Sequence, residues 1–324
     1  YFLSIKRFKL SFNYINFMLD IRLIRGNPSL IKKDLEKRFQ TDKIKWVEEL
    51  LGLDKEFRDI KKQVDELRHR RNKLSLEINV AKKEKKDIKQ LLKEAQEIPG
   101  KIRKIEERIE TIAKRVYYLL MRIPNYLHKD VPIGKGEIEN RLIRKFGEIS
   151  RSKFKPEGHE EIGVSLGLLD IERAAKISGA RFYFLKGDLA LLELALVRFA
   201  IDFIMKKGYE LILPPFMMRR TPYEGVVDLA DFEEMLYKIE NEDLYMIATS
   251  EHPLTARFMN EFLNSKDLPI KNIGYSTNFR KEAGAHGKDT KGIFRVHQFN
   301  KVEQIVICKP KDSWKYHEEL IKNL

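Results

Sequence analysis

The chain has 324 residues, of which 43% are hydrophobic and 35% are charged, and its net charge is +14. No apolar run reaches the roughly 18 residues that a membrane-spanning helix requires, so no membrane partner is expected. The positive charge favours polyanions, with nucleic acid the first candidate, although a lysine-rich composition alone would give the same balance. The single cysteine, Cys308, excludes an internal disulfide and a multi-cysteine zinc site, and it predicts a reduced cytoplasmic setting.

The two ends of the chain predict a fragment. Residues 1–17 are mixed aromatic and basic, and we interpret them as an upstream extension because Met18 opens a cleaner segment where translation is expected to start. At the other end, Leu324 follows an amphipathic stretch without a helix stop signal. Between these ends, the first predicted element is a short helix opened by Asn27 and Pro28.

Residues from about 44 to 123 have the apolar spacing of a coiled coil. Steps of three and four residues run without a miss from Ile98 to Ile123, and a looser stripe precedes them. The charged run 82–87 has nothing to bury and predicts a tip, while Pro99 and Gly100 are expected to interrupt the returning helix near its start. The pattern predicts two antiparallel helices, each about 50 Å long at 1.5 Å per residue.

The predicted hairpin carries an excess of positive charge. Between residues 43 and 122 there are 23 Lys and Arg against 15 Asp and Glu, so the hairpin holds eight of the 14 net positive charges. Charge can merely solvate a narrow coil, but such a coil would interleave the two signs evenly. The excess of one sign therefore favours a polyanionic partner.

Pro124 ends the hairpin and marks the predicted domain boundary. Beyond it strands and helices mix, which indicates an α+β domain without the glycine-rich fingerprint of Rossmann or P-loop nucleotide sites. Cys308 follows an apolar run in the last strand and is expected to be a small core residue. The predicted elements are strands over 181–185, 209–213, 244–248 and 301–308 and an amphipathic helix over 189–205.

The densest polar cluster runs from Phe279 to Glu303 and predicts a strand, a polar loop and a returning strand. Arg280 and Arg295 have the forked charge that suits phosphate oxygens. By the period of two, Phe299 is expected to share the strand face of Arg295, where it can stack on a base, and Glu303 stays on that face. Its carboxylate can accept a hydrogen bond from a hydroxyl or an ammonium group. A surface hairpin of alternating charge is the open alternative.

Several strings resemble the class II aminoacyl-tRNA synthetases, in the form found in seryl-tRNA synthetases. The strings are Phe279-Arg280-x-Glu282, the loop 287–292 and 295–299 for the second class II motif, 208–215 for the first motif, Thr249-Ser250-Glu251 for the serine-binding loop, and 178–187 ahead of the first motif. The basic hairpin lies where that family keeps its tRNA-binding arm. The resemblance covers nearly all of residues 18–324.

This resemblance implies a serine–tRNA ligase that uses ATP and Mg²⁺, with tRNA(Ser), L-serine and a second copy of the chain as partners. It implies a long antiparallel coiled-coil hairpin followed by an incomplete α+β catalytic domain with an antiparallel sheet. The implied residues are Arg280 and Arg295 for catalysis; Arg280, Lys281, Glu282, Arg295, Val296 and Phe299 for ATP; Thr249, Ser250, Glu251, Arg280, Lys301 and Glu303 for serine; and Gly208, Tyr209 and Pro215 for the dimer interface.

The implied chemistry needs no protein nucleophile. The serine carboxylate attacks the α-phosphorus of ATP, pyrophosphate leaves, and arginines with Mg²⁺ stabilise the spreading charge before the tRNA hydroxyl takes the seryl group. His286 and His297 are therefore not expected to act as general bases. Ser250 and Lys281 replace the smaller residues usual in the family, and neither side chain is expected to be essential.

The resemblance also predicts what the chain lacks. Residues 18–124 are expected to form the tRNA-binding domain and 125–324 a catalytic domain without the third class II motif. The family's metal-binding Glu and Ser lie shortly before that motif and are expected to be missing as well. No metal ligand is therefore expected within this chain, and serine activation is expected to be inefficient. Two alternatives are a ligase that charges a carrier protein, against which the hairpin argues, and a coiled-coil RNA-binding protein with an inactive synthetase-like head.

Overall fold

The structure, a computed structural model, describes residues 19–148, 153–227, 234–282 and 292–324. The chain divides into two compact units, and the boundary in the sequence lies between Phe146 and Gly147. The predicted start at Met18, the loop histidine His286 and the loop residues 287–291 lie outside the described residues. Among the helices that are described, none is long and apolar enough to cross a bilayer.

The first unit is helical. Its elements are Ile21–Gly26 (α1), Pro28–Lys37 (α2), the 3₁₀ turn Thr41–Lys43 (η3), Ile44–Lys83 (α3), Lys89–Leu120 (α4) and the 3₁₀ turn Glu137–Glu139 (η4). The predicted helix start at Asn27 is confirmed: its side-chain oxygen accepts a hydrogen bond from the Leu30 N–H at 3.1 Å. Pro28 lies in the first turn, where a missing N–H leaves no bond unmade.

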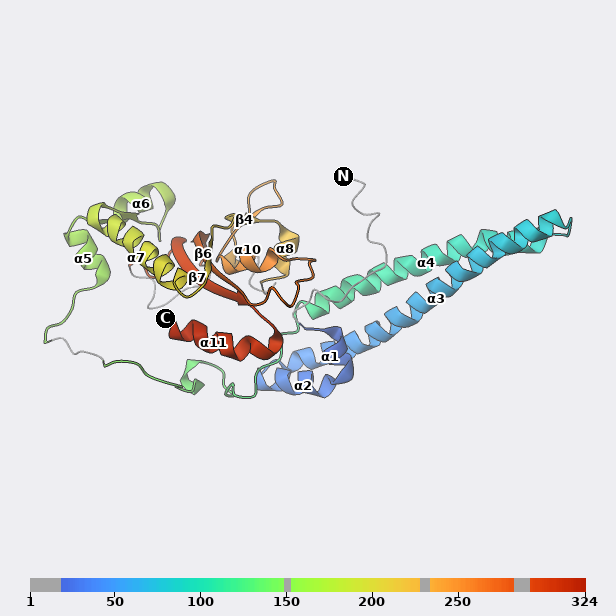
Figure 1. The fold of residues 1–324 in the computed structure, drawn as a ribbon, viewed down its shortest axis with the longest axis horizontal. Coiled ribbons are helices and arrows are strands. Elements are labelled where there is room, and N and C mark those ends of the chain that lie inside the picture. The colour runs from blue at the N-terminus through green and yellow to red at the C-terminus, as the bar shows by residue number, and fades with distance from the viewer. Residues whose placement is uncertain (1–18, 149–152, 228–233, 283–291) are drawn as a thin grey trace. The chain divides into compact units, whose positions relative to one another are not determined.

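The predicted hairpin is confirmed: α3 and α4 lie side by side and residues 84–88 join them at the tip (Figure 1). Their seam is one apolar cluster, in which Val64 and Leu74 of α3 are buried with Ile102 and Ile109 of α4. Each such side chain contributes about 1.5–3 kcal/mol by leaving water, which holds two long helices together despite their charge.

The predicted interruption at Pro99 and Gly100 is wrong, because α4 continues through both residues. Pro99 is exposed, so its ring lies on the solvent side of the helix. Ile98 and Ile102 are buried in the seam. Packing of that apolar face outweighs the roughly 3 kcal/mol that a proline costs in a helix interior.

The segment after the hairpin stays attached to the helical unit. Arg38 Nη2 donates to the Asn125 carbonyl at 2.6 Å, and the Leu127 N–H donates to Asp34 Oδ1 at 2.6 Å. The compact unit therefore continues past residue 124 to Phe146. The predicted functional boundary after residue 124 stays a prediction.

The second unit mixes short strands and helices. Its elements are His159–Ser165 (α5), Leu169–Asp170 (β1), Ile171–Ser178 (α6), Phe184–Leu185 (β2), Gly187–Met205 (α7), Glu210–Ile212 (β3), Met217–Met218 (β4), Arg220–Glu224 (α8), Tyr245–Met246 (β5), Glu251–Ala256 (α10), Ile270–Phe279 (β6), Gln298–Ile307 (β7), the 3₁₀ turn Pro310–Asp312 (η6) and Ser313–Lys322 (α11). The predicted helix over 189–205 is confirmed as α7. The strand predicted over 181–185 is shorter, because Arg181 has a φ of 65°, outside the extended region.

The central sheet has the order β3-β6-β7. β6 and β7 form a long antiparallel ladder, which confirms the predicted antiparallel sheet, and β3 joins β6 in parallel. On one face, Ile273 and Val302 pack with Ile204 of α7 and Leu320 of α11. The expectation that Cys308 is a core residue is wrong: β7 ends at Ile307, and Cys308 is only partly buried.

Candidate active site

The opposite face of this sheet is polar. Residues two apart along a strand share a face, so Phe299, Lys301 and Glu303 of β7 point to the same side. Their cross-strand partners in β6 are, in the same order, Asn278, Ser276 and Gly274. The predicted face for Phe299 and Glu303 is therefore found, on the side away from the α7–α11 core.

Glu303 lies at the centre of a hydrogen-bond cluster. Its Oε2 accepts from the Thr249 hydroxyl, from the Ser250 hydroxyl at 3.0 Å and from the Glu251 N–H at 3.1 Å. Its Oε1 accepts from Lys301 Nζ at 2.5 Å, and Lys301 Nζ also donates to the Thr249 hydroxyl at 3.1 Å. The fold thus brings together five of the six residues predicted for serine, from two segments about 50 residues apart in sequence.

These contacts keep Glu303 ionised although it is largely buried. Burial opposes the negative charge, but hydrogen bonds from Lys301, Thr249 and Ser250 outweigh it and hold the pKa of the Glu303 carboxyl below its usual value. The neighbouring acid behaves oppositely. Loss of solvent around Glu251, followed by repulsion from Glu303, raises the pKa of the Glu251 carboxyl.

Arg280, the sixth residue predicted for serine, follows β6 and lies beside this cluster. Its Nε donates to the Ala248 carbonyl at 3.3 Å, and its guanidinium carbon lies 5.1 Å from the centre of the Phe299 ring. The cation therefore lies over one face of the Phe299 ring, the side chain that was predicted to stack on a base. Arg280 and Phe299 thus place a cation and an aromatic ring on the sheet face that holds Glu303.

The predicted strand position of Arg295 is wrong, because β7 begins only at Gln298 and the period of two does not extend to residue 295. Arg295 Nε instead donates to Glu282 Oε2 at 2.6 Å. This ion pair joins the two sides of the loop between β6 and β7. Arg181 supports the same place: its guanidinium donates to the Glu282 carbonyl at 3.1 Å, and its own carbonyl accepts the His297 N–H.

The other residues predicted for ATP line the same region. Val296 is 6% exposed, directly before β7, and the Lys281 N–H donates to the Met235 carbonyl at 2.9 Å. His297 Nδ1 donates to the Arg280 carbonyl at 2.8 Å. Through this bond His297, just before β7, is joined to the residue that follows β6.

Sequence reasoning missed a buried polar layer beneath the site. The Tyr223 hydroxyl, fully buried, accepts the Ala248 N–H at 3.1 Å and lies 3.0 Å from His252 Nδ1. Burial lowers the pKa of His252 to about 4, so its ring is neutral near pH 7. Because Ala248 also receives Arg280, this pair positions the guanidinium from below. No spacing in the sequence links Tyr223 to Ala248. The one available sequence signal was His252, which directly follows the predicted serine-binding residues Thr249, Ser250 and Glu251.

The residues predicted for a dimer interface are placed differently from one another. Gly208 and Pro215 are exposed, whereas Tyr209 is 3% exposed. The Tyr209 hydroxyl donates to Glu319 Oε1 at 3.0 Å, and burial with this bond raises the pKa of Tyr209. Tyr209 thus belongs to the interior of its own subunit.

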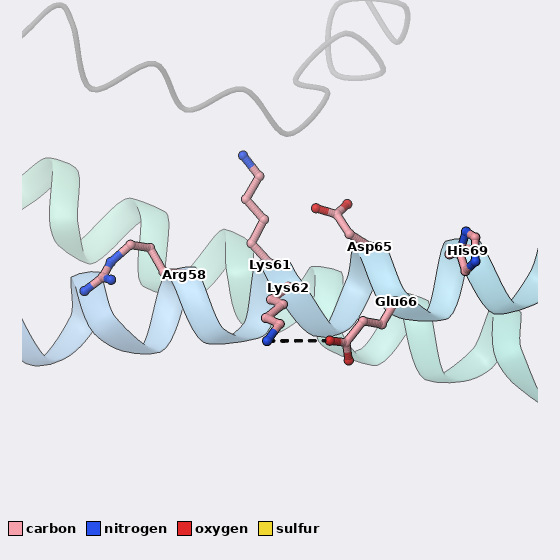
Figure 2. A pocket seen from close by; sticks show the side chains of 6 residues that line it. All are labelled: Arg58, Lys61, Lys62, Asp65, Glu66 and His69. Atoms are coloured by element: carbon pink, nitrogen blue, oxygen red, sulfur yellow. Dashed lines mark ion pairs between the residues drawn. The ribbon is translucent and has the colours of Figure 1, made fainter.

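A hollow of about 530 Å³ lies elsewhere, in the helical unit (Figure 2). Its six lining side chains all come from α3: Arg58, Lys61, Lys62, Asp65, Glu66 and His69. They are mostly charged, and Lys62 and Glu66 lie 3.9 Å apart in an exposed ion pair. Because small-molecule sites are concave, largely apolar and built from several elements, we assign no ligand to this surface.

Comparisons with known proteins agree with the geometry. Residues 18–127 match the family model of the seryl-tRNA synthetase N-terminal domain, and residues 234–324 match the class II tRNA synthetase core domain (G, H, P, S and T). The serine–tRNA ligase of Methanocella arvoryzae is 50% identical over 306 residues, which cover 94% of this chain and 72% of the relative. That of Pyrococcus horikoshii is 46% identical over 326 residues, with the same coverage.

Solved structures give the same result. The crystal structure of seryl-tRNA synthetase from Pyrococcus horikoshii, complexed with ATP, superposes with a TM-score of 0.86 at 45% identity and covers 94% of this chain and 73% of that one. The cytoplasmic serine–tRNA ligase of Naegleria fowleri in complex with AMP has a TM-score of 0.78 at 38% identity. With the hairpin, the antiparallel sheet and the polar cluster around Glu303, these matches show that the chain belongs to the seryl-tRNA synthetases, the aminoacyl-tRNA synthetases that act as serine–tRNA ligases.

Proposed function

We propose that serine binds against Glu303 and ATP binds beside Arg280 and Phe299. The observation that supports this most is the gathering of Thr249, Ser250, Glu251 and Lys301 around the Glu303 carboxylate. An ionised, largely buried carboxylate with one oxygen open to a further donor suits a substrate hydroxyl. ATP binding is supported by the relatives of known structure, which are complexed with ATP or AMP.

In the proposed reaction, Arg280 holds the serine carboxylate against the α-phosphate while Phe299 stacks on adenine. The carboxylate oxygen forms a bond to phosphorus, and pyrophosphate leaves with the bonding electron pair. The fixed positive charge of Arg280 stabilises the phosphate oxygens as their charge grows. Arg295 takes the γ-phosphate and Glu282 the adenine end, so ATP replaces the ion pair that joins these residues.

We infer that Mg²⁺ arrives on the ATP phosphates. Among the described residues, no group of three or more His, Cys, Asp or Glu side chains has the arrangement of a metal site. Mg²⁺ commonly binds through substrate phosphates and only one or two carboxylates. The cation would supply further charge neutralisation on those phosphates, and no residue of this chain is assigned to it.

We infer that residues 18–124 bind tRNA(Ser) through the hairpin, and that the catalytic domain begins at residue 125. The ion pairs between α3 and α4 are made by arginines, such as Arg70 with Glu94 at 2.6 Å and Arg115 with Glu49 at 2.6 Å. Many lysines of the hairpin are exposed and are therefore available to a polyanion. Within the described part of the hairpin, those without a recorded ion pair include Lys61, Lys82, Lys83, Lys85, Lys93 and Lys104. Flexible exposed cations of this kind suit the tRNA backbone.

We also propose a two-fold homodimer through α7 and the segment after β3. On α7, the large apolar side chains Leu191, Leu194 and Phe199 are 63%, 59% and 68% exposed, and Leu213 beyond β3 is 69% exposed. Large apolar side chains exposed on elements that contact each other, as on α7 and just after β3, are typical of a protein interface. Gly208 and Pro215 lie on the same surface segment, and Tyr209 supports it from inside.

The dimer is tested by sedimentation at micromolar concentration. Phe199→Glu is expected to give monomers, because it buries a charge in the proposed interface. Leu76→Glu is the matched control, since Leu76 is 67% exposed on the hairpin, outside that interface. A wild-type chain that sediments as a monomer contradicts the proposal.

The serine site is tested with two unreactive adenylate mimics, seryl- and alanyl-sulfamoyl adenosine, which differ only in the hydroxyl. A site that pairs a substrate hydroxyl rejects the analogue lacking it by about 10⁴–10⁵ in catalysis, and a large preference is expected in binding. Glu303→Ala should remove at least about a hundredfold of it, whereas Glu172→Ala, an exposed acid in α6, should change nothing. Unchanged discrimination in Glu303→Ala would refute the role.

A further inference from the structure

Ser250 occupies an unusual place in the candidate site. Its side chain is fully buried between α10 and β6, and its hydroxyl donates to Glu303 Oε2 at 3.0 Å. From the sequence, this hydroxyl was expected to be inessential. The structure instead makes it one of three donors to the same carboxylate oxygen, with the Thr249 hydroxyl and the Glu251 N–H.

The number of donors decides where a substrate can bind. An ionised carboxylate offers about four lone-pair sites, two on each oxygen. Three donors already crowd Oε2, whereas among the residues that the structure describes Lys301 Nζ is the one donor to Oε1. Only Oε1 therefore retains room for the hydroxyl of a bound serine.

Gly274 makes this arrangement possible. It lies opposite Glu303 in the ladder between β6 and β7. A Cβ atom at residue 274 would lie 2.6 Å from Ser250 Oγ, 2.8 Å from Ser250 Cβ and 2.7 Å from Leu254 Cδ1. All three distances are below normal contact, so the side chain of Ser250 fills the space that any other residue at position 274 would need.

We propose that Ser250 is a specificity-determining residue, which fixes the rotation of the Glu303 carboxylate so that Oε1 alone reads the substrate hydroxyl, and that Gly274 makes room for it. The inference rests on the proposed serine site. Ser250 acts through Glu303, and it is a positioning residue that does not touch ATP. Its removal should lower the preference for serine and leave nucleotide binding unchanged.

The test uses the full chain and the same pair of adenylate mimics, with AMP as a third ligand. Ser250→Ala removes only the hydroxyl oxygen and should lower the ratio of seryl to alanyl affinity about tenfold, the value of one hydrogen bond to a charged group. AMP affinity should stay constant. Leu254→Met is the matched packing control: it alters the same buried contact, keeps the hydroxyl and should keep the ratio.

Gly274→Ala gives an independent measurement. Its added carbon must displace Ser250, so the ratio should fall at least as far as in Ser250→Ala. The double variant Gly274→Ala with Ser250→Ala should lose no more hydroxyl discrimination than Gly274→Ala alone, because both changes remove the same hydrogen bond. Full additivity in the ratio would contradict the shared mechanism.

The outcomes separate the two proposals. If the wild-type chain does not prefer the seryl mimic, the proposed serine site fails and this inference fails with it. If the wild-type chain discriminates and Glu303→Ala does not, but Ser250→Ala keeps the full ratio, only the role of Ser250 is overturned. Equal losses for both mimics in Ser250→Ala also overturn it, because a purely structural defect does not distinguish the hydroxyl.

Discussion

Each unit of this molecule buries an acidic side chain, and the two are satisfied in different ways. In the helical unit, Asp54 is 1% exposed and is enclosed by two arginines: Arg25 Nε and Nη2 contact it at 3.0 and 2.9 Å, and Arg58 Nε at 3.1 Å. In the sheet unit, Glu303 receives hydroxyls and an amide on one oxygen and a single lysine on the other.

The difference supports a structural role for Asp54 and the proposed binding role for Glu303. Asp54 has donors on both oxygens from charged groups, so its contacts stabilise the junction of α1 and α3. Among the described residues, Asp54 is thus paired with two cations, whereas Glu303 is paired with one and receives its other hydrogen bonds from neutral groups.

The largest effect is expected from removal of the hairpin, which tests whether tRNA binding and serine binding belong to different units. Deleting residues 55–115 should abolish tRNA binding, because the basic surface is lost, and should spare binding of the seryl mimic. Gel-shift and calorimetric titrations of the same preparation measure the two. If both survive, the hairpin is a spacer whose charge only solvates it; if both fail, the hairpin supports the fold of the sheet unit.

The buried acid of the helical unit gives the next largest effect. Asp54→Ala leaves Arg25 and Arg58 without their shared partner and should destabilise the base of the hairpin by about 3 kcal/mol, near the lower end for a broken buried pair because both arginines are partly exposed. Hydrogen exchange of α3 measures this. Asp59→Ala, at an exposed position one turn further, is the control. Equal exchange in both variants contradicts a structural role for Asp54.

The two acids of the candidate site, Glu251 and Glu303, predict a smaller effect, which is a pH dependence of affinity for the seryl mimic. Glu251 has a raised pKa, so it takes up a proton as the pH falls from 7 toward its usual range, and an attraction to the serine ammonium is lost. Affinity for the seryl mimic should fall by up to about tenfold, the value of one charged hydrogen bond. Glu303, with its lowered pKa, stays ionised over that window, and His252 stays neutral.

Titrations between pH 7.5 and 5 measure this dependence, because that range lies above the ordinary carboxyl pKa, where a raised pKa shows. Glu251→Gln should flatten the profile, and adenosine, which has neither an ammonium group nor a phosphate that titrates in this range, should show no change in either protein. A profile that is equally steep in Glu251→Gln assigns the titration to another group.

The smallest effect concerns the tip of the hairpin. Changing Lys82, Lys83, Lys85 and Lys86 to Ala should weaken tRNA binding only a few-fold, because each is one mobile charge among many, and it should make affinity less sensitive to salt. A loss as large as that of the deletion would place the main contact at the tip. The same four changes should leave the seryl mimic unaffected.

Much of the helical unit was predictable because its information is local. Apolar steps of three and four residues from Ile98 to Ile123 specify a helix and its buried face together. The same steps outweighed Pro99, where a single-residue rule predicted a break. A periodic face sums over many contacts, whereas the proline rule concerns one hydrogen bond.

The candidate site was predictable only in part, because its contacts are between distant segments. Alternation along β7 was enough to group Phe299, Lys301 and Glu303, but it failed for Arg295, which precedes the strand. The support from Tyr223 depends on how α8 packs on α10, and that from Gly274 on how Ser250 and Leu254 lie against β6. No period in the sequence reports that packing, and only the three-dimensional arrangement gives the Ser250 hydroxyl its partner.

The two faces of β7 have a thermodynamic consequence. One face holds Glu303, and the other packs Val302 and Val306 against the core that includes Ile204 of α7, the helix proposed to join two subunits. The strand β7 thus contributes one face to the proposed serine site and the other to the core beneath the proposed subunit interface. By linkage, any free energy with which serine binding alters subunit association is equal to that with which association alters serine affinity. Measuring ligand affinity above and below the dissociation constant of the dimer gives that coupling free energy directly.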